Sequence, residues 1–324
     1  MHAIQIRRTG GPDVLEYANV PEPEPGPGQV RIKLAAIGVN FIDIYYRIGL
    51  YPATLPLIPG EEGAGVVEKL GPGVVSLAVG DRVAYTGVGA SYSELVVAQA
   101  ERLVKLPASI SFVQGAAAML QGMTAHYLST ATYPLKPDDV ALVHAGAGGV
   151  GLLLTQMAKI RGATVISTVS TEQKAELSRK AGADHVIIYT KQNFLDEVTR
   201  ITGNRGVSVV YDSVGRDTFE HSLNCLRPRG YLVLYGQSSG KVPPIDPQIL
   251  NSGGSLFLTR PTLRDYIAGT DSLRMRADEV FGWIESGRLS LRTEHNYPLS
   301  QAFVAQSELE GRRTTGKIVL IPGE

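Results

Sequence analysis

The sequence predicts an α/β protein made of a β-rich domain and a second domain with a doubly wound parallel sheet. The chain has 324 residues, more than a single hydrophobic core usually organises. Residues 1–121 show short strand patterns between Pro and Gly clusters, and from Val140 onward strand patterns alternate with helical ones. We therefore expect residues 1–121 and 260–324 to form the β-rich domain, and residues 122–259 to form the parallel-sheet domain.

In the β-rich part, apolar and polar residues alternate as expected for half-buried strands. The alternating segments are Val30–Leu34, Val66–Leu70 and Ser93–Val97. Turn-forming clusters such as Pro21–Gly28 and Gly71–Gly73 separate them, a spacing typical of a compact barrel or rolled sheet. Near the end of the chain, a helix over Asp271–Ser286 and a strand over Gly316–Ile321 are predicted to rejoin this domain.

The middle of the chain alternates between near-continuous apolar strands and helical stretches. The predicted strands are Val140–His144, Thr164–Val169, His185–Tyr189, Val207–Asp212, Tyr231–Gly236 and Ser255–Thr259. The predicted helices are residues 111–131, Val150–Arg161, Thr171–Ala181, Asn193–Thr202 and Asp217–Cys225. Such alternation is typical of a parallel sheet that helices cover on both faces.

Composition excludes several classes of function. Lys plus Arg and Asp plus Glu number 31 each, so no net field recruits nucleic acid or an anionic membrane. Cys225 is the one cysteine, which excludes an internal disulfide and a thiolate-rich zinc site. The N-terminus lacks an apolar stretch of the signal-peptide kind, and no later run has the length of a membrane span, so we expect a cytoplasmic protein.

A glycine-rich turn follows the first strand of the parallel-sheet domain. Residues 146–151 read GAGGVG, which matches the G-x-G-x-x-G pattern between a strand and a helix. In such a turn the glycines permit a tight bend, a close approach of backbone to a pyrophosphate, and close packing of the helix on the strand. The helix N-terminus directs its N–H groups at the anion. The residues predicted to bind dinucleotide phosphates are Gly146, Ala147, Gly148, Gly149 and Val150.

The residues after the second strand favour NADPH over NADH. An NAD enzyme places an Asp or Glu at the tip of this strand, on the ribose 2′-hydroxyl. Here the strand is followed by Ser170, while Lys174 lies one helical turn on and Tyr189 closes the third strand. We predict that these three side chains bind a 2′-phosphate, the alternative being that Lys174 is only a solvated helix lysine. We interpret the neighbouring Glu172 as a first-turn helix residue favoured by the helix dipole.

Motifs spread over the whole chain carry a family resemblance. They are Gly38–Asp43, Pro59–Gly65, Gly80–Val83, Gln121–Tyr127, His144–Leu152, Gly236–Gly240, Thr259–Pro261 and Arg312–Gly316. In these motifs the chain resembles the zeta-crystallin-like quinone oxidoreductases, which are zinc-independent members of the medium-chain dehydrogenase/reductase superfamily. The resemblance implies a GroES-like catalytic domain split around a Rossmann domain. It also implies an NADPH:quinone oxidoreductase whose quinone binds in the cleft between the domains.

The same resemblance implies chemistry without a metal. Zinc-dependent members of the superfamily hold the ion with two Cys and a His, and the corresponding positions here are Asn40, Glu61 and Gln121. Such oxygen donors do not suit tetrahedral Zn²⁺. No ligand spacing links the six histidines, which are His2, His126, His144, His185, His221 and His295. Alcohol oxidation needs a metal to stabilise an alkoxide, whereas a quinone or conjugated enone accepts hydride without one.

By resemblance, five side chains surround the nicotinamide and the substrate. They are Asn40, Asp43, Tyr45, Tyr51 and Tyr127. A phenol can stack on a quinone ring or donate to the developing quinol oxygen, and Tyr51 is the candidate donor of most interest. The alternative is that individual tyrosines only pack and that Asp43 only caps or anchors its loop.

Further contacts to the cofactor are predicted on other segments. They are Thr124, Ser213, Gly236, Ser238, Ser239, Arg260 and Arg312. Gly236, Ser238 and Ser239 follow the fifth strand at its carboxyl end, where α/β proteins bind ligands. Arg260 and Arg312 are expected to reach the cofactor or to close the cleft, with an exposed surface role as the alternative.

The sequence leaves two other functions open. One is NADPH-dependent reduction of α,β-unsaturated carbonyls, such as alkenals or enoyl thioesters. The other is a low-activity NADPH-binding protein of crystallin-like or RNA-binding type, against which the neutral charge argues. The resemblance also implies a homodimer, in which the apolar edge strand Ser255–Thr259 would pair across a two-fold axis.

Overall fold

The computed structural model describes residues 1–323, which form two compact units. The first unit combines Met1–Met123 with the residues from Ile267 onward, and the second unit comprises Thr124–Tyr266. The predicted fold class, α/β with a β-rich part and a parallel sheet, is confirmed. No helix within residues 1–323 combines the length and the apolar character needed to cross a membrane.

The first unit is built on a seven-stranded sheet with the order β14-β15-β3-β4-β5-β7, in which β6 pairs with β3. Its strands are β3 (Gln29–Val39), β4 (Glu62–Leu70), β5 (Arg82–Thr86), β6 (Leu95–Gln99), β7 (Val104–Lys105), β14 (His295–Pro298) and β15 (Ile318–Ile321). A separate two-stranded sheet joins β1 (His2–Gln5) to β2 (Glu16–Asn19). Strand β15 pairs antiparallel with β3, so the end of the chain extends a sheet that begins near its start.

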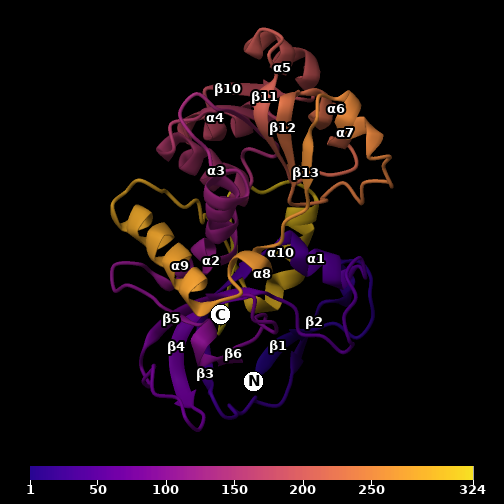
Figure 1. Cartoon of the computed structure of the whole chain (residues 1–324). Coiled ribbons are helices and arrows are strands. Elements are labelled where there is room, and N and C mark those ends of the chain that lie inside the picture. The colour runs from indigo at the N-terminus through magenta and orange to yellow at the C-terminus, as the bar shows by residue number, and fades with distance from the viewer. Residues whose placement is uncertain (324) are drawn as a thin grey trace. The chain divides into compact units, whose positions relative to one another are not determined.

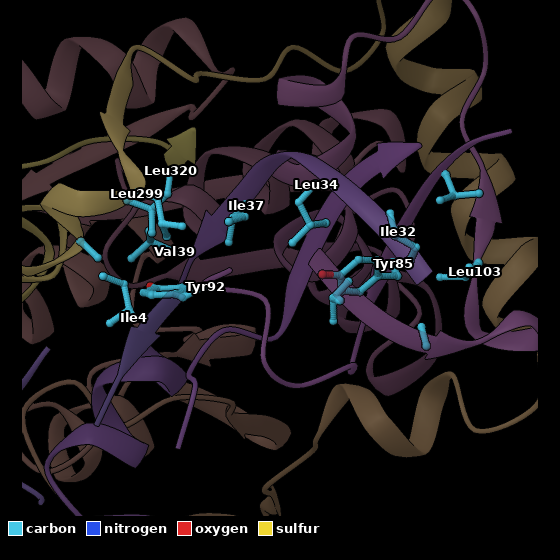
Figure 2. Close-up of a cluster of buried hydrophobic side chains, with 14 of the residues drawn as sticks. Ile4, Ile32, Leu34, Ile37, Val39, Tyr85, Tyr92, Leu103, Leu299 and Leu320 are labelled. Atoms are coloured by element: carbon cyan, nitrogen blue, oxygen red, sulfur yellow. The ribbon is translucent and has the colours of Figure 1, made fainter. Parts of the chain in front are cut away.

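The core of the first unit draws on both stretches of sequence. Figure 2 shows part of it, with side chains of β3 beside those of the C-terminal segment. Leu299 and Leu320 are each no more than 1% exposed within this core. Full burial of a leucine stabilises by about 1.5–3 kcal/mol, so these contacts hold the C-terminal segment in the first unit. The helices of this unit are α1 (Phe41–Arg47), α9 (Thr270–Glu285), α10 (Ala302–Glu310) and most of α2 (Phe112–Tyr127).

Six parallel strands in the order β10-β9-β8-β11-β12-β13 form the sheet of the second unit (Figure 1). They are β8 (Val140–Val143), β9 (Thr164–Val169), β10 (His185–Ile188), β11 (Val207–Asp212), β12 (Leu226–Leu234) and β13 (Phe257–Thr259). The helices are α3 (Gly149–Ile160), α4 (Glu172–Lys180), α5 (Phe194–Thr202), α6 (Phe219–Asn224), α7 (Gln248–Ser252) and α8 (Leu263–Tyr266). This is the strand order of the Rossmann fold, whose ligands bind beyond the carboxyl ends of the strands where the order reverses, here between β8 and β11.

Several element boundaries differ from the sequence prediction. Ser255 has φ 57°, in the left-handed region, so β13 begins at Phe257 instead. The helix predicted over residues 111–131 divides into α2 and a wider helical turn, Leu128–Thr132. Helix α10 is not predicted from the sequence, because its buried residues are small or polar and leave no apolar stripe to detect.

Candidate functional site

The glycine turn joins β8 to α3, with Gly148 as the N-cap residue just before the helix. A Cβ atom on Gly146 would lie 1.7 Å from Ser167 Oγ, and a Cβ atom on Gly151 would lie 2.3 Å from the Ala145 oxygen. A side chain would therefore clash at both positions. The close packing that the G-x-G-x-x-G pattern predicts is present in the structure.

The start of α3 offers an anion site. The first bond inside the helix runs from the Leu152 N–H to the Gly148 oxygen, at 2.9 Å. The preceding amides, at residues 149–151, have no partner within the helix, as is true of the first N–H groups of any α-helix. The helix dipole adds partial positive charge at this end. The turn therefore fits the pyrophosphate of a dinucleotide.

Strands β9 and β10 end together, because Val169 lies opposite Ile188 in their parallel register. Ser170 follows β9 and Tyr189 follows β10, so both lie at the same edge of the sheet. The hydroxyl of Thr190 donates to the Ser170 oxygen at 2.8 Å, which holds the two segments together. Tyr189 is 41% exposed and can reach a ligand at this edge.

Helix α4 starts directly after this edge and carries the predicted lysine. Thr171 caps the helix by accepting the Lys174 N–H at 3.2 Å, which sets Lys174 in the first turn. Glu172 forms an ion pair with Arg179 at 2.9 Å. The carboxylate of Glu172 is thereby engaged along α4, as expected for a helix residue and not for a ribose ligand. No acidic residue ends β9.

The loops after β11 and β12 pack against each other through their backbones. A Cβ atom on Gly236 would lie 2.6 Å from the Ser213 oxygen, and the Ser238 N–H donates to that oxygen at 3.1 Å. The hydroxyl of Ser239 donates to a carbonyl of the β11 loop at 2.8 Å and accepts an N–H at 3.0 Å. The structure therefore brings these four predicted residues together and uses the Ser239 hydroxyl to hold the loop.

Four other predicted residues lie outside these loops. Thr124 is buried in α2, while Arg260 is exposed after β13. Tyr127, at the end of α2, is 2% exposed and stacks on Tyr266 with the ring centroids 4.1 Å apart. That stacking fits the alternative in which Tyr127 only packs. Arg312 belongs to the first unit, in the exposed turn after α10, with φ 56°.

In the first unit, three strand ends bring polar side chains into one buried group, here named the polar cluster. Strand β3 ends before Asn40, β4 begins at Glu62, and Lys317 precedes β15. Asn40 Nδ2 donates to Glu62 Oε1 at 2.6 Å, and the Lys317 ammonium donates to Asn40 Oδ1 at 2.8 Å. Lys317 also forms an ion pair with Glu62. Gln121 Nε2 donates to Asn40 Oδ1 at 3.3 Å.

The charges of the polar cluster are shielded from water. The side chains of Glu62 and Lys317 are 0% and 3% exposed. Burial lowers the pKa of Lys317, and the Glu62 carboxylate opposes that shift. Glu62 Oε2 accepts the Leu120 N–H at 2.6 Å. Gly38 makes room for the carboxylate, because a Cβ atom there would lie 2.2 Å from Glu62 Oε1.

Asp43 lies in the first turn of α1. Its Oδ2 accepts the Asn40 N–H at 2.8 Å and the Tyr92 hydroxyl at 3.0 Å. Its Oδ1 is buried and has no hydrogen-bond partner among residues 1–323. Burial raises the pKa of Asp43 to about 8, although the Asn40 N–H opposes this. We therefore expect a protonated carboxyl at neutral pH, which also anchors the start of α1.

Helix α1 also carries an aromatic group. The rings of Tyr45 and Tyr51 meet edge to face with centroids 5.2 Å apart, and Tyr46 lies 5.8 Å from Tyr51. The Tyr51 N–H donates to the Tyr45 oxygen at 3.1 Å. Tyr45 is 8% exposed, whereas Tyr51 is only partly buried. The structure thus gathers four of the five predicted catalytic residues, including Asn40 and Asp43, on or next to α1.

Known proteins resemble the chain over its full length. A family model of the alcohol dehydrogenase GroES-like domain matches residues 26–108, and a model of the zinc-binding dehydrogenase family matches residues 149–286. A quinone oxidoreductase of Pseudomonas aeruginosa is 49% identical over 98% of this chain and 99% of its own. The chain belongs to the quinone oxidoreductase family.

Two more relatives of this chain bear on the ligand and the substrate. The crystal structure of Escherichia coli quinone oxidoreductase complexed with NADPH matches with a TM-score of 0.98 and 44% identity, over 99% of this chain and 100% of that one. A 2-haloacrylate reductase of Burkholderia sp. is 44% identical over 99% of this chain and 98% of its own length. The family and the GroES-like and Rossmann parts predicted from the sequence are confirmed.

In this quinone oxidoreductase family member, Asn40 and Gln121 occupy two positions that the sequence analysis matched to zinc ligands. They are hydrogen-bonded to each other at 3.3 Å, and the cation that contacts Asn40 is the Lys317 ammonium. The carboxylate in the polar cluster is that of Glu62, while Glu61 is partly exposed. Residues 1–323 contain no group of three or more His, Cys, Asp or Glu side chains arranged to hold a metal ion.

Sequence reasoning missed Glu62 and Lys317. Two adjacent glutamates at residues 61 and 62 look alike in the sequence, and only the pairing of β3 with β4 shows which one turns inward. The signal that could have distinguished them is Gly38, because glycine is the one residue type that leaves space opposite Glu62. That signal becomes readable only when the register of the two strands is known.

Proposed function

We propose that this chain is an NADPH:quinone oxidoreductase that transfers hydride from NADPH to a quinone without a metal. The observation that carries the proposal is similarity over the full chain, with 49% identity to a quinone oxidoreductase and a TM-score of 0.98 to another in complex with NADPH. The glycine turn supports it, because its geometry suits a dinucleotide. NADPH supplies the hydride, and the protein binds and orients the reactants.

The residues of the second unit fit NADPH in particular. Of the residues predicted to bind the phosphates, we assign the amides of Gly149 and Val150 to the pyrophosphate, together with that of Gly151. The N–H groups of Gly146 and Gly148 already donate to backbone oxygens, at 3.0 and 2.9 Å. We assign Ser170, Lys174 and Tyr189 to the 2′-phosphate, since two hydroxyls can donate to it and an ammonium can neutralise it. The carboxylate of Glu172 is paired with Arg179 at 2.9 Å, so it does not stand against the phosphate as an unpaired charge.

The residues around α1 are assigned to the acceptor. Reduction adds a hydride and a proton to the quinone, and negative charge develops on a quinone oxygen in between. Tyr51 is our candidate donor to that oxygen, because Tyr45 and Tyr46 hold its ring while the side chain stays partly exposed. Asn40 is assigned a positioning role, because Glu62 and Lys317 already occupy its amide.

Reduction of activated alkenes is a second candidate activity. It is favoured by the 2-haloacrylate reductase, which is 44% identical and matches 99% of this chain. A haloacrylate and a quinone share a carbon–carbon double bond conjugated to a carbonyl group, so each can accept a hydride while charge moves onto oxygen. The two candidates therefore differ in the preferred acceptor and not in the hydride donor.

A homodimer and a cytoplasmic location complete the proposal. Strand β13 is an edge of the second unit's sheet, and its Phe257 is 46% exposed while stacking on Tyr231 at 4.4 Å. A matching strand from a second copy would satisfy the edge backbone groups and cover this ring. Analytical ultracentrifugation should give twice the mass of the chain, and a monomer mass would remove the dimer from the proposal.

Steady-state kinetics tests the activity. The purified protein is assayed with NADPH and NADH against benzoquinone, phenanthrenequinone, 2-alkenals and 2-chloroacrylate, with and without a chelator. We expect NADPH with a quinone to give the largest kcat/KM, and the chelator to have no effect. A larger kcat/KM for the alkenes in every comparison would favour the second candidate. Activity lost to the chelator and restored by zinc would contradict the metal-free mechanism.

A further inference from the structure

A chain of buried polar side chains connects the segments assigned above to NADPH. It runs from Thr168 in β9 through His144, which follows β8, to Ser222 in α6 and Asp212 at the end of β11. His144 Nδ1 lies 2.8 Å from Thr168 Oγ1, and His144 Nε2 lies 3.0 Å from Ser222 Oγ. Ser222 Oγ lies 3.0 Å from Asp212 Oδ2. All four residues are at most 1% exposed.

Asp212 fixes the direction of these hydrogen bonds. Its Oδ1 accepts the N–H groups of Val214 and Gly215 at 2.8 and 3.0 Å. Its Oδ2 accepts the Thr218 hydroxyl at 2.7 Å. An ionised carboxylate has no proton to donate and can only accept hydrogen bonds, so Ser222 must donate its single hydroxyl proton to Asp212.

The tautomer of His144 follows from this direction. With its proton given to Asp212, the Ser222 oxygen has only lone pairs to offer, so His144 Nε2 must carry a hydrogen. Burial lowers the pKa of His144, which keeps the ring neutral and leaves Nδ1 as an acceptor. Thr168 therefore donates to Nδ1. Each hydrogen bond in the chain points from Thr168 towards Asp212.

We propose that His144, as the neutral Nε2–H tautomer, is a positioning residue that fixes the NADPH-binding segments relative to one another. On one side, Thr168 is tied to the glycine turn twice, because its oxygen accepts the Gly146 N–H at 3.0 Å and its hydroxyl donates to His144. On the other side, Asp212 holds the amides of the loop that contains Ser213. The inference rests on the proposed function, since it concerns how NADPH is held.

The chain of bonds acts on the part that NADPH and NADH share. The backbone amides that its members hold belong to the glycine turn and to the loop after β11. The side chains assigned to the 2′-phosphate, Ser170, Lys174 and Tyr189, are not members of this hydrogen-bond chain. Breaking one of these side-chain hydrogen bonds should therefore weaken the binding of NADPH and of NADH by the same factor. That result would separate this role from a contact to the 2′-phosphate, which affects NADPH alone.

The experiment compares three variants of the full-length protein. Thr168→Val removes the hydroxyl while keeping the shape, and Thr168→Ser restores a hydroxyl. Thr155→Val is the matched control, because Thr155 is a buried threonine of α3 whose hydroxyl has no hydrogen-bond partner among residues 1–323. Fluorescence titration should show the Kd of NADPH and of NADH raised roughly fivefold in Thr168→Val. Both Kd values should stay within about twofold of wild type in the other two variants.

Nitrogen-15 NMR of histidine-labelled wild-type protein reads the tautomer directly, with His144→Phe to assign the signal. We expect a protonated Nε2 and an unprotonated Nδ1. A protonated Nδ1, or a Thr168→Val variant that loses thermal stability while its Kd values match wild type, would overturn the positioning role and leave the proposed function intact. A wild-type protein that binds neither dinucleotide would instead overturn the proposed function, and the positioning role with it.

Discussion

The two units each bury an aspartate in a polar network, and the two carboxyl groups are treated differently. In the second unit, Asp212 accepts four hydrogen bonds, two from backbone amides and two from hydroxyls. In the first unit, Asp43 accepts two on one oxygen, while its other oxygen is buried without a partner among residues 1–323. Both side chains are 0% exposed.

The difference shows two ways to bury a carboxyl group. The second unit surrounds its carboxylate with neutral donors, so the loss of one donor leaves three. The first unit relies on one countercharge, the Lys317 ammonium beside Glu62, and on a proton that neutralises Asp43. Removing either one leaves a buried carboxylate whose charge nothing balances. The first network should therefore be the more sensitive to substitution and to pH.

Lys317→Met should have the largest effect on stability. It leaves the Glu62 carboxylate buried without its cation, which should lower the free energy of unfolding by about 3–5 kcal/mol. Urea unfolding measures this loss. Thr218→Val, which removes one of four donors to Asp212, should cost only about 1 kcal/mol.

The double variant Lys317→Met with Glu62→Gln tests the cause of that loss. A neutral amide keeps the shape of Glu62 and no longer needs a cation, so the double variant should be more stable than Lys317→Met alone. If the losses simply add, the buried charge is not what destabilises the single variant.

Gly38→Ala should break the same ion pair by steric means. The added methyl would lie 2.2 Å from Glu62 Oε1, so the carboxylate must leave its place beside Lys317. We expect the free energy of unfolding to fall by about 2 kcal/mol. Gly282→Ala is the matched control, since its added methyl meets nothing within 4 Å, and it should raise stability by about 0.5 kcal/mol. Equal losses in both variants would disprove the clash.

Lys174→Ala tests the electrostatics of the second unit. Loss of a charged hydrogen bond to the 2′-phosphate should raise the Kd of NADPH by about tenfold and leave that of NADH nearly unchanged. Lys180→Ala is the control on the same helix, where Lys180 pairs with Glu176 at 2.8 Å and should not affect either cofactor. Equal effects of Lys174→Ala on NADPH and NADH would refute the phosphate assignment.

The sequence predicted the second unit better than the first because its signals are local. The glycine turn, the strand before it and the helix after it lie within one short segment, and each glycine has a steric reason that the motif already states. The absence of an acid at the end of β9 is equally local. The hydrogen bonds of His144 were missed, since its partners lie 24 and 78 residues away in the chain.

The polar cluster of the first unit could not be derived from sequence spacing. Its members Asn40, Glu62 and Lys317 are separated by up to 277 residues and meet only because β15, β3 and β4 pair in one particular register. A shift of one residue along β4 would exchange Glu62 for Glu61 or Gly63. Strand pairing over such separations leaves no periodic trace in the sequence, so its partners appear only in the structure.

The protonation of Asp43 predicts a pH dependence specific to the first network. The pKa of Asp43 is raised from 3.8 to about 8, so between these values the folded protein keeps a proton that the unfolded chain has released. Its contribution to stability is therefore fully present below about pH 4 and is lost as pH rises through about 8. Asp43→Asn has no such proton, so the stability of wild type relative to this variant should fall with rising pH, by about 1 kcal/mol per pH unit. Urea unfolding of both proteins at several pH values measures the difference, in which other titrating groups cancel. A difference that stays constant from pH 5 to pH 8 would mean that Asp43 is ionised in the folded protein, and the contrast with Asp212 would then disappear.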